Sequence, residues 1–206
     1  MTEFMSYDPY RHVASRNGIQ CDLLISALQK SIRRGLAEEA VAVAYEMYIT
    51  SEFLEEKLWR RLQAISVEDV GFGDLSAPVL INALNQMRRN FPYNDGDRPI
   101  FFVHAIRYLA AAKKDRTSDN LKNIVITEFE YGRVPEIPDF ALDMHTEAGR
   151  ALGRDFRHFL AEGSRVANEL PVEESYKARL LALLDRIDQE APPKVQDPFP
   201  YNSWQA

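Results

Sequence analysis

Apolar residues recur every three to four positions along most of this chain, and this spacing limits the fold more than any other feature. Leu24, Leu28 and Ile32 are four residues apart, and the segment 51–65 repeats the pattern. Such spacing places apolar side chains on one face of an α-helix, whereas a half-buried strand alternates apolar and polar residues. Only 123–127 resembles a strand, and the helical period around it continues through that segment. The sequence therefore predicts an all-α fold.

Turn residues divide this pattern into about eight or nine helices. Gly35 is placed to end the first helix, and Ser76 and Pro78 are placed to begin the fourth. The expected helices are 22–35, 36–50, 51–65, 76–91, 100–114, 118–132, 140–153, 155–170 and 172–190. The corresponding organisation is an N-terminal arm (1–18), a helical domain (19–131), additional helices (132–190) and an extended Pro-rich and aromatic-rich C-terminal arm (191–206).

Composition places the chain among folded cytoplasmic proteins. Hydrophobic residues make up 46% and charged residues 27%, which is ordinary for a globular protein. Cys21 is the single cysteine, so an internal disulfide and a cysteine-based metal site are both excluded. A reducing compartment is expected. No apolar run approaches the roughly 18 residues of a membrane span, and no secretory signal precedes the helices.

The stretch 58–74, LWRRLQAISVEDVGFGD, combines adjacent acids with a Gly-x-Gly. A dinucleotide loop needs G-x-G-x-x-G between a strand and a helix, and a helix precedes this one. Adjacent acids on a helix point about 100° apart, so they are poorly placed to act as one acid–base pair. We interpret the stretch as a structural corner in which an acid pairs with a cation from a neighbouring helix. The residues assigned to the corner are Lys30, Arg60, Arg61, Ser66, Glu68, Asp69 and Gly71.

An alternative site lies in 139–162, where acids and histidines are close in sequence. Asp139, Asp143 and Glu147 would share one face of a helix. A metal-binding or hydrolytic enzyme could use the residues Asp143, His145, Glu147, His158 and Glu162. The Glu-x-x-His spacing of di-metal bundles is missing, so we expect no metal or other cofactor. Arg150, Arg154 and Arg157 favour internal ion pairs instead.

Direct DNA binding is a second alternative, through the basic residues Lys30, Arg33, Arg34, Lys113 and Lys114. The formal net charge of −6 argues against an extensive nucleic-acid surface. Clusters of this kind are usually solvated helix faces.

Catalytic motifs are missing from the sequence. It contains no P-loop, no Gly-x-Ser-x-Gly and no zinc-protease helix. His12 lies in the N-terminal arm, and His104 lies in an apolar segment where a buried core histidine is expected. An enzyme is therefore less favoured than a binding protein.

Three segments carry a resemblance to a known family. ISALQKSIRRG (25–35), RRLQAISVEDVGFGD (60–74) and AIRYLAAAKK with NLKN beyond (105–123) resemble the helical C-terminal region of RarA/MgsA-type replication-associated recombination ATPases, which are relatives of clamp loaders. The resemblance runs from about Cys21 to about Ile126 and implies a clamp-loader C-terminal-domain-like helical fold. The family's AAA+ motor, with its P-loop and Walker B strand, has no counterpart in this sequence.

The resemblance implies an assembly function without ATP hydrolysis. We expect a homo-oligomer, either a dimer or a tetramer, and docking to a replication or repair protein or to an AAA+ motor. The C-terminal arm supports self-association, since Phe199, Tyr201 and Trp204 are apolar side chains that need a surface to cover them.

Overall fold

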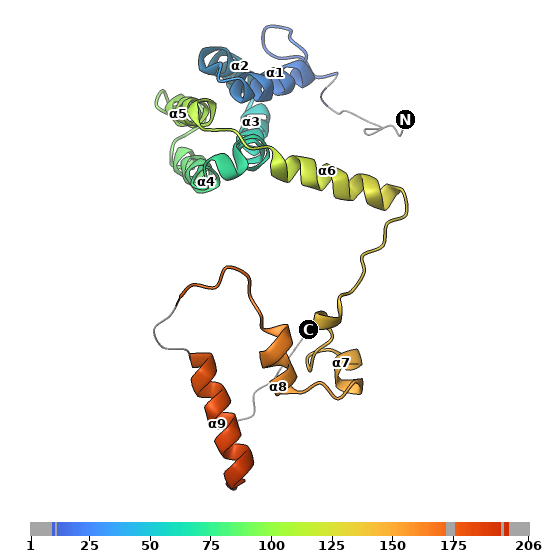
Figure 1. Cartoon of the computed structure of the whole chain (residues 1–206). Helices are drawn as coiled ribbons and strands as arrows, with labels where there is room; N and C mark the ends of the chain where they lie inside the picture. Colours follow the sequence, from blue (N-terminus) through green and yellow to red (C-terminus); the bar gives the residue numbers. More distant parts are fainter. Residues whose placement is uncertain (1–9, 11, 172–175, 195, 198–206) are drawn as a thin grey trace. The chain divides into compact units, whose positions relative to one another are not determined.

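The described part of the chain is helical throughout. The computed structural model describes residues 10, 12–171, 176–194 and 196–197, and it divides into two compact units between Val134 and Pro135. Within those ranges the only β pairing is an isolated bridge between Ala14 and Gln20, which confirms the all-α prediction. The α-helices are α1 (Cys21–Arg33), α2 (Ala37–Thr50), α3 (Glu52–Ile65), α4 (Ala77–Met87), α5 (Arg98–Ala111), α6 (Thr117–Glu130), α7 (Glu147–Ala151), α8 (Phe156–His158) and α9 (Tyr176–Glu190) (Figure 1).

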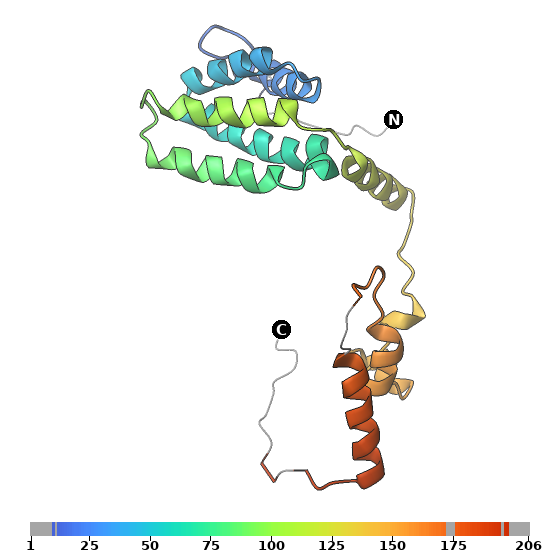
Figure 2. The ribbon, with the colours of Figure 1, turned by 60° about the vertical axis from the view of Figure 1, so that its left-hand side comes forward.

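Helices α1 to α5 of the first unit pack side by side around one apolar core (Figures 1 and 2). The stripe predicted in α1 is buried, with Leu28 and Ile32 fully inaccessible. Gly35 has a φ of +77°, a backbone conformation that suits glycine, and it follows the C-terminus of α1 as expected. The turn at 34–36 then returns the chain as α2.

The start of α4 differs in detail from the prediction. Pro78 lies in the first turn, as expected. Ser76 occupies the N-cap position without capping, because its hydroxyl donates to the Asp74 carboxylate instead. The Tyr108 hydroxyl donates to the same carboxylate, and these hydrogen bonds lower the pKa of Asp74. The loop before α4 is thereby attached to α5.

The part of the N-terminal arm that precedes α1 is attached to α2 through Glu46. Its carboxylate accepts hydrogen bonds from the Ser15 hydroxyl (2.6 Å), the Asn17 backbone N–H (2.9 Å) and the Asn17 amide (2.7 Å). These bonds, above all the one from Ser15, lower the pKa of Glu46. Residues 13–20 thus form a loop fixed on the bundle.

A buried ion cluster braces α3 against α5 and the end of α4, and the sequence reasoning did not find it. The Glu55 carboxylate lies 3.1 Å from Nη1 of Arg88 and 2.8 Å from Nη2 of Arg98. Glu55 and Arg88 are both buried. A sequence signal existed, because Glu55 shares the apolar face of α3 with Leu58 and Leu62.

Helix α6 leaves the bundle and buries none of its apolar side chains. Figures 1 and 2 show it projecting from the corner at the end of α3. Asp119 is its only buried residue. Leu121, Ile124 and Phe129 are all at least half exposed. An isolated helix of about this length is only marginally stable in water, and the bundle does not cover the apolar face of this one.

The second unit is less helical than predicted. The expected helix 140–153 is instead a 3-10 turn (η4, Asp139–Ala141), an irregular turn and α7. Local side-chain bonds explain the break: Asp143 accepts from the His145 N–H, and the Thr146 side chain caps α7 by accepting from the Gly149 N–H. These bonds compete with helix continuation.

The later helices of this unit also end differently. The expected helix 155–170 consists of α8 and a π-helical turn (η5, Phe159–Gly163), and no helix follows in 165–171. Arg157 donates to Asp185 and Asp188 and so connects α8 with α9. Most of the C-terminal arm, including Phe199, Tyr201 and Trp204, lies outside the described residues. Among the described helices, none combines the length and apolarity needed to cross a membrane.

Candidate functional site

The corner at 66–73 begins where α3 loses its α-helical hydrogen bonding. The chain continues as a π-helical turn (η1, Ser66–Val70) and a 3-10 turn (η2, Gly71–Gly73). Ser66 is buried, and its hydroxyl donates to the Gln63 carbonyl rather than capping a following turn. Val70 is fully buried, so the corner is anchored in the core.

Gly71 and Gly73 allow the connection between α5 and α6 to lie directly against the corner. The Asp115 N–H donates to the carbonyls of Asp69 and Val70 at 3.0 and 3.1 Å. A Cβ added at Gly71 would lie 2.4 Å from the Asp115 carbonyl oxygen, and one added at Gly73 would lie 2.4 Å from that of Lys113. The Gly-x-Gly therefore serves a close approach between two chain segments.

Gly71→Ala is expected to lower the free energy of unfolding by about 1–3 kcal/mol, because its φ of +51° is unfavourable for alanine and the new methyl group meets the Asp115 carbonyl. Thermal or urea unfolding would measure the loss. Gly96→Ala is the control, since a Cβ there meets no atom within 4 Å. Equal stability of the two variants would contradict the close-approach role.

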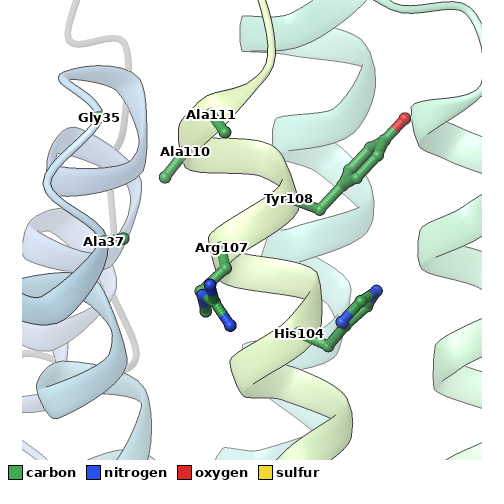
Figure 3. A pocket seen from close by; sticks show the side chains of 7 residues that line it. All are labelled: Gly35, Ala37, His104, Arg107, Tyr108, Ala110 and Ala111. Carbon is green, nitrogen blue, oxygen red and sulfur yellow. The ribbon is translucent and has the colours of Figure 1, made fainter.

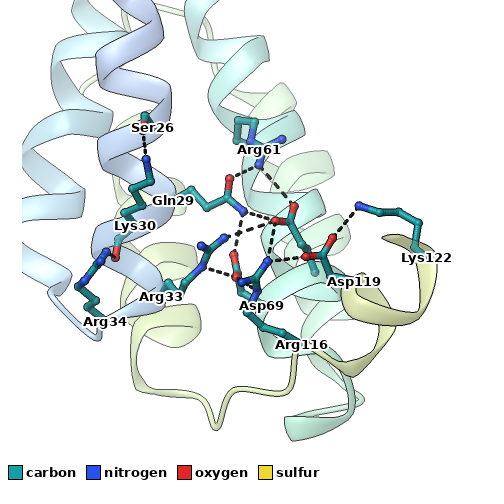
Figure 4. A network of polar contacts seen from close by, with 11 residues as sticks. Ser26, Gln29, Lys30, Arg33, Arg34, Arg61, Asp69, Arg116, Asp119 and Lys122 are labelled. Atoms are coloured by element: carbon teal, nitrogen blue, oxygen red, sulfur yellow. Dashed lines mark hydrogen bonds and ion pairs between the residues drawn. The ribbon is translucent and has the colours of Figure 1, made fainter. Parts of the chain in front are cut away.

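Asp69 is the centre of the polar network at the corner (Figure 4). Its carboxylate is fully buried and lies 2.6 Å from Nε of Arg33 on α1 and 3.1 Å from Nε of Arg116, the residue before α6. Gln29 donates a further hydrogen bond at 3.0 Å. One acid therefore joins α1, η1 and the start of α6.

Glu68 and Asp119 extend this network at its edges. Glu68 accepts from Gln29 at 2.7 Å, and its contacts with arginine are longer, 3.4 Å to Arg33 and 3.6 Å to Arg61. Asp119, in the first turn of α6, pairs with Arg116 and with Lys122. These bonds fix the base of α6 on the bundle.

The cations that pair with Glu68 and Asp69 differ in part from those predicted. Arg61 contacts Glu68 as expected. Lys30 and Arg60 do not: Lys30 donates to Ser26 in its own helix, and Arg60 is exposed on the outer side of α3. Helix packing turns Arg33 toward the acids in place of Lys30.

The network lacks the properties of an acid–base site. Its carboxylates are held by guanidinium groups, which do not release protons in proteins, and no neutral base lies between them. Buried, mutually neutralised charges of this kind typically fix geometry. The arrangement supports a structural role that sets the direction of α6.

The alternative site in the second unit brings together only part of its predicted residues. The Asp143 carboxylate lies 3.0 Å from Nδ1 of His145, and this hydrogen bond lowers the pKa of Asp143. The His158 charge acts in the same direction with a smaller effect. Gly149 allows α7 to lie against the backbone of Asp143, since a Cβ there would overlap the Asp143 carbonyl.

The remaining acids point to other partners. Glu162 pairs with Arg165 at 3.0 Å, and Glu147 is exposed at the start of α7. Asp139 pairs with Arg154 instead of sharing a helix face with Asp143. In the part of the chain that the structure describes, no three His, Cys, Asp or Glu side chains are placed to hold a metal ion.

Four of the five residues considered for DNA contact have partners within the protein. Lys30 donates to the Ser26 hydroxyl, and Arg34 donates to the Lys30 carbonyl at the end of α1. Arg33 pairs with Asp69. Lys114 donates to the carbonyls of Leu109, Ala110 and Ala112 at the end of α5, and its burial lowers its pKa. Lys30, Arg34 and Lys113 remain exposed.

A groove between α2 and α5 is a further feature that the sequence reasoning missed. One part has a volume of about 460 Å³ and is lined by His104, Arg107 and Tyr108 (Figure 3). His104 is exposed, so its prediction as a core histidine is wrong. The buried positions of α5 are 102, 105, 106, 109 and 110, and residue 104 lies on the opposite side of the helix.

No model of a known protein family matches this chain, and no curated protein shows a significant match.

Proposed function

We propose that this chain is a non-catalytic helical assembly module that associates with a second copy of itself through the apolar face of α6. The observation that carries the proposal is that α6 exposes Leu121, Ile124, Val125 and Phe129, which share one side of the helix. The polar network supports the proposal, because it holds the base of α6 while leaving its apolar face uncovered.

The proposed location and partners of this assembly module rest on the resemblance to the RarA/MgsA-type ATPases. A module like the C-terminal region of RarA/MgsA-type ATPases would act in the cytoplasm as a dimer or tetramer, and it would dock to a replication or repair protein or to an AAA+ motor. The clamp-loader-like fold belongs to the same proposal. The paired state of Glu68 and Asp69 supports binding over catalysis.

Ile124→Asp is expected to weaken self-association at least about tenfold, because a charge at the centre of a buried apolar interface lacks a partner. Sedimentation velocity on the full chain at tens of micromolar would follow the shift toward monomer. Ile100→Asp is the matched control, since Ile100 on α5 is 59% exposed and Ile124 is 54% exposed. Circular dichroism would verify that both variants remain folded.

Two results would contradict the proposal. One is a wild-type chain that is monomeric across this concentration range. The other is an oligomer that both aspartate variants weaken equally or leave intact, since the contact would then lie elsewhere.

A further inference from the structure

The groove between α2 and α5 consists of two adjoining depressions of about 460 and 700 Å³. Ala37 and Arg107 line both of them, so the depressions adjoin each other. Val41 and Tyr45 of α2 line the larger one together with Val103 of α5. The two helices thus form an open channel along the outside of the bundle.

The two ends of this channel have different linings. Gly35, Ala37, Ala110 and Ala111 line one end, together with the larger side chains of His104 and Tyr108. The other end has larger apolar side chains, and Tyr45 is half exposed there. A groove between two helices with apolar walls fits an amphipathic helix.

Arg107 lies at the middle of the channel and determines which helix fits. Figure 3 shows its side chain between α5 and the start of α2. It forms no ion pair or hydrogen bond with any residue that the structure describes, although Glu38 lines the same depression. Covering an unpaired guanidinium with apolar surface is costly, whereas a carboxylate pairs with it in bidentate geometry.

We infer that the channel is a docking site for an acidic amphipathic helix of a partner protein. The helix places a carboxylate on Arg107 and apolar side chains on both sides of it, one toward Ala110 and Ala111 and one toward Val41 and Val103. On α5, Val103, Arg107 and Ala110 follow at i, i+4 and i+7. A partner helix with Leu, Glu and Leu at the same spacing matches this row.

The test uses the full chain and a synthetic helical peptide of about 15 residues with Leu, Glu and Leu at i, i+4 and i+7. Fluorescence anisotropy of the labelled peptide measures binding. Replacing the peptide's glutamate by lysine is expected to weaken binding roughly tenfold, and Arg107→Glu is expected to weaken binding of the original peptide by a similar factor. The lysine peptide should regain affinity for the Arg107→Glu chain.

Arg60→Glu is the matched control, because Arg60 is exposed on α3, makes no ion pair within the described residues and lies outside the channel. It should leave peptide binding unchanged. Equal binding of the glutamate and lysine peptides, or equal loss in the Arg60 and Arg107 variants, would overturn the inference. A sedimentation shift to monomer in Arg107→Glu would overturn it too, since a second copy would then occupy the channel.

Discussion

Glu55→Gln is expected to lower the free energy of unfolding by about 3–5 kcal/mol, the usual cost of removing one partner from a buried ion pair. Glu55 is 1% exposed and faces Arg88, whose side chain is fully buried, and Arg98, which is nearly so. Glutamine keeps the shape but removes the charge that both guanidinium groups require. Chemical denaturation monitored by circular dichroism would measure the loss.

Glu56→Gln is the control for this prediction. Glu56 is the next residue on α3 and also pairs with Arg88, but its side chain is 38% exposed. Water and salt screen such a pair, so we expect a loss of at most about 1 kcal/mol. Similar losses in the two variants would mean that burial does not set the strength of this cluster.

Asp69→Asn is expected to have the second largest effect, a loss of about 3 kcal/mol. The carboxylate is fully buried and holds Arg33 and Arg116. The value lies at the low end for a buried pair because both arginines are partly exposed and keep contacts with Glu68 or Asp119. Thermal unfolding of the variant would measure the change.

Glu68→Gln distinguishes a structural corner from a functional one. Glu68 is 26% exposed and its ion pairs are longer than those of Asp69, so a loss of at most about 1 kcal/mol is expected. Functional acids often behave in the opposite way, since removing them tends to preserve or improve stability. If Glu68→Gln and Asp69→Asn both melt at or above the melting temperature of the wild-type chain, the corner is a functional site.

The sequence by itself determined the helical class and most helices of the first unit. The apolar spacing in α1 and α3 predicts that these helices form and which face of each is buried. An apolar stripe along one side of a helix is removed from water when that side packs on other helices. The same reasoning failed in the second unit. There, short-range bonds from Asp143 and Thr146 to the backbone replace helical turns.

For the candidate site, the sequence predicted the type of interaction but not most of the partners. That Glu68 and Asp69 pair with cations followed from their type and setting, and Arg61 was among the partners named. Arg33 and Arg116 were not, because the pairing of Asp69 with them depends on how α1 and the α5–α6 connection pack on the corner. The periodicity of a sequence shows on which side of its own helix a side chain lies. It does not show which other helix packs against that side.

The exposed face of α6 and the α2–α5 groove were likewise decided by the tertiary structure. In sequence, α6 has the same apolar spacing as α1, yet α1 is buried in the bundle and α6 projects from it (Figure 2). In the sequence, nothing distinguishes Arg107 from the other basic residues. The packing of α2 against α5 places it in a channel. The sequence determined which residues form helices and which faces of them are apolar. Which of those faces meet was decided by contacts between segments far apart in the chain: the shared apolar core of α1 to α5, the buried charges and the close approach at Gly71 and Gly73.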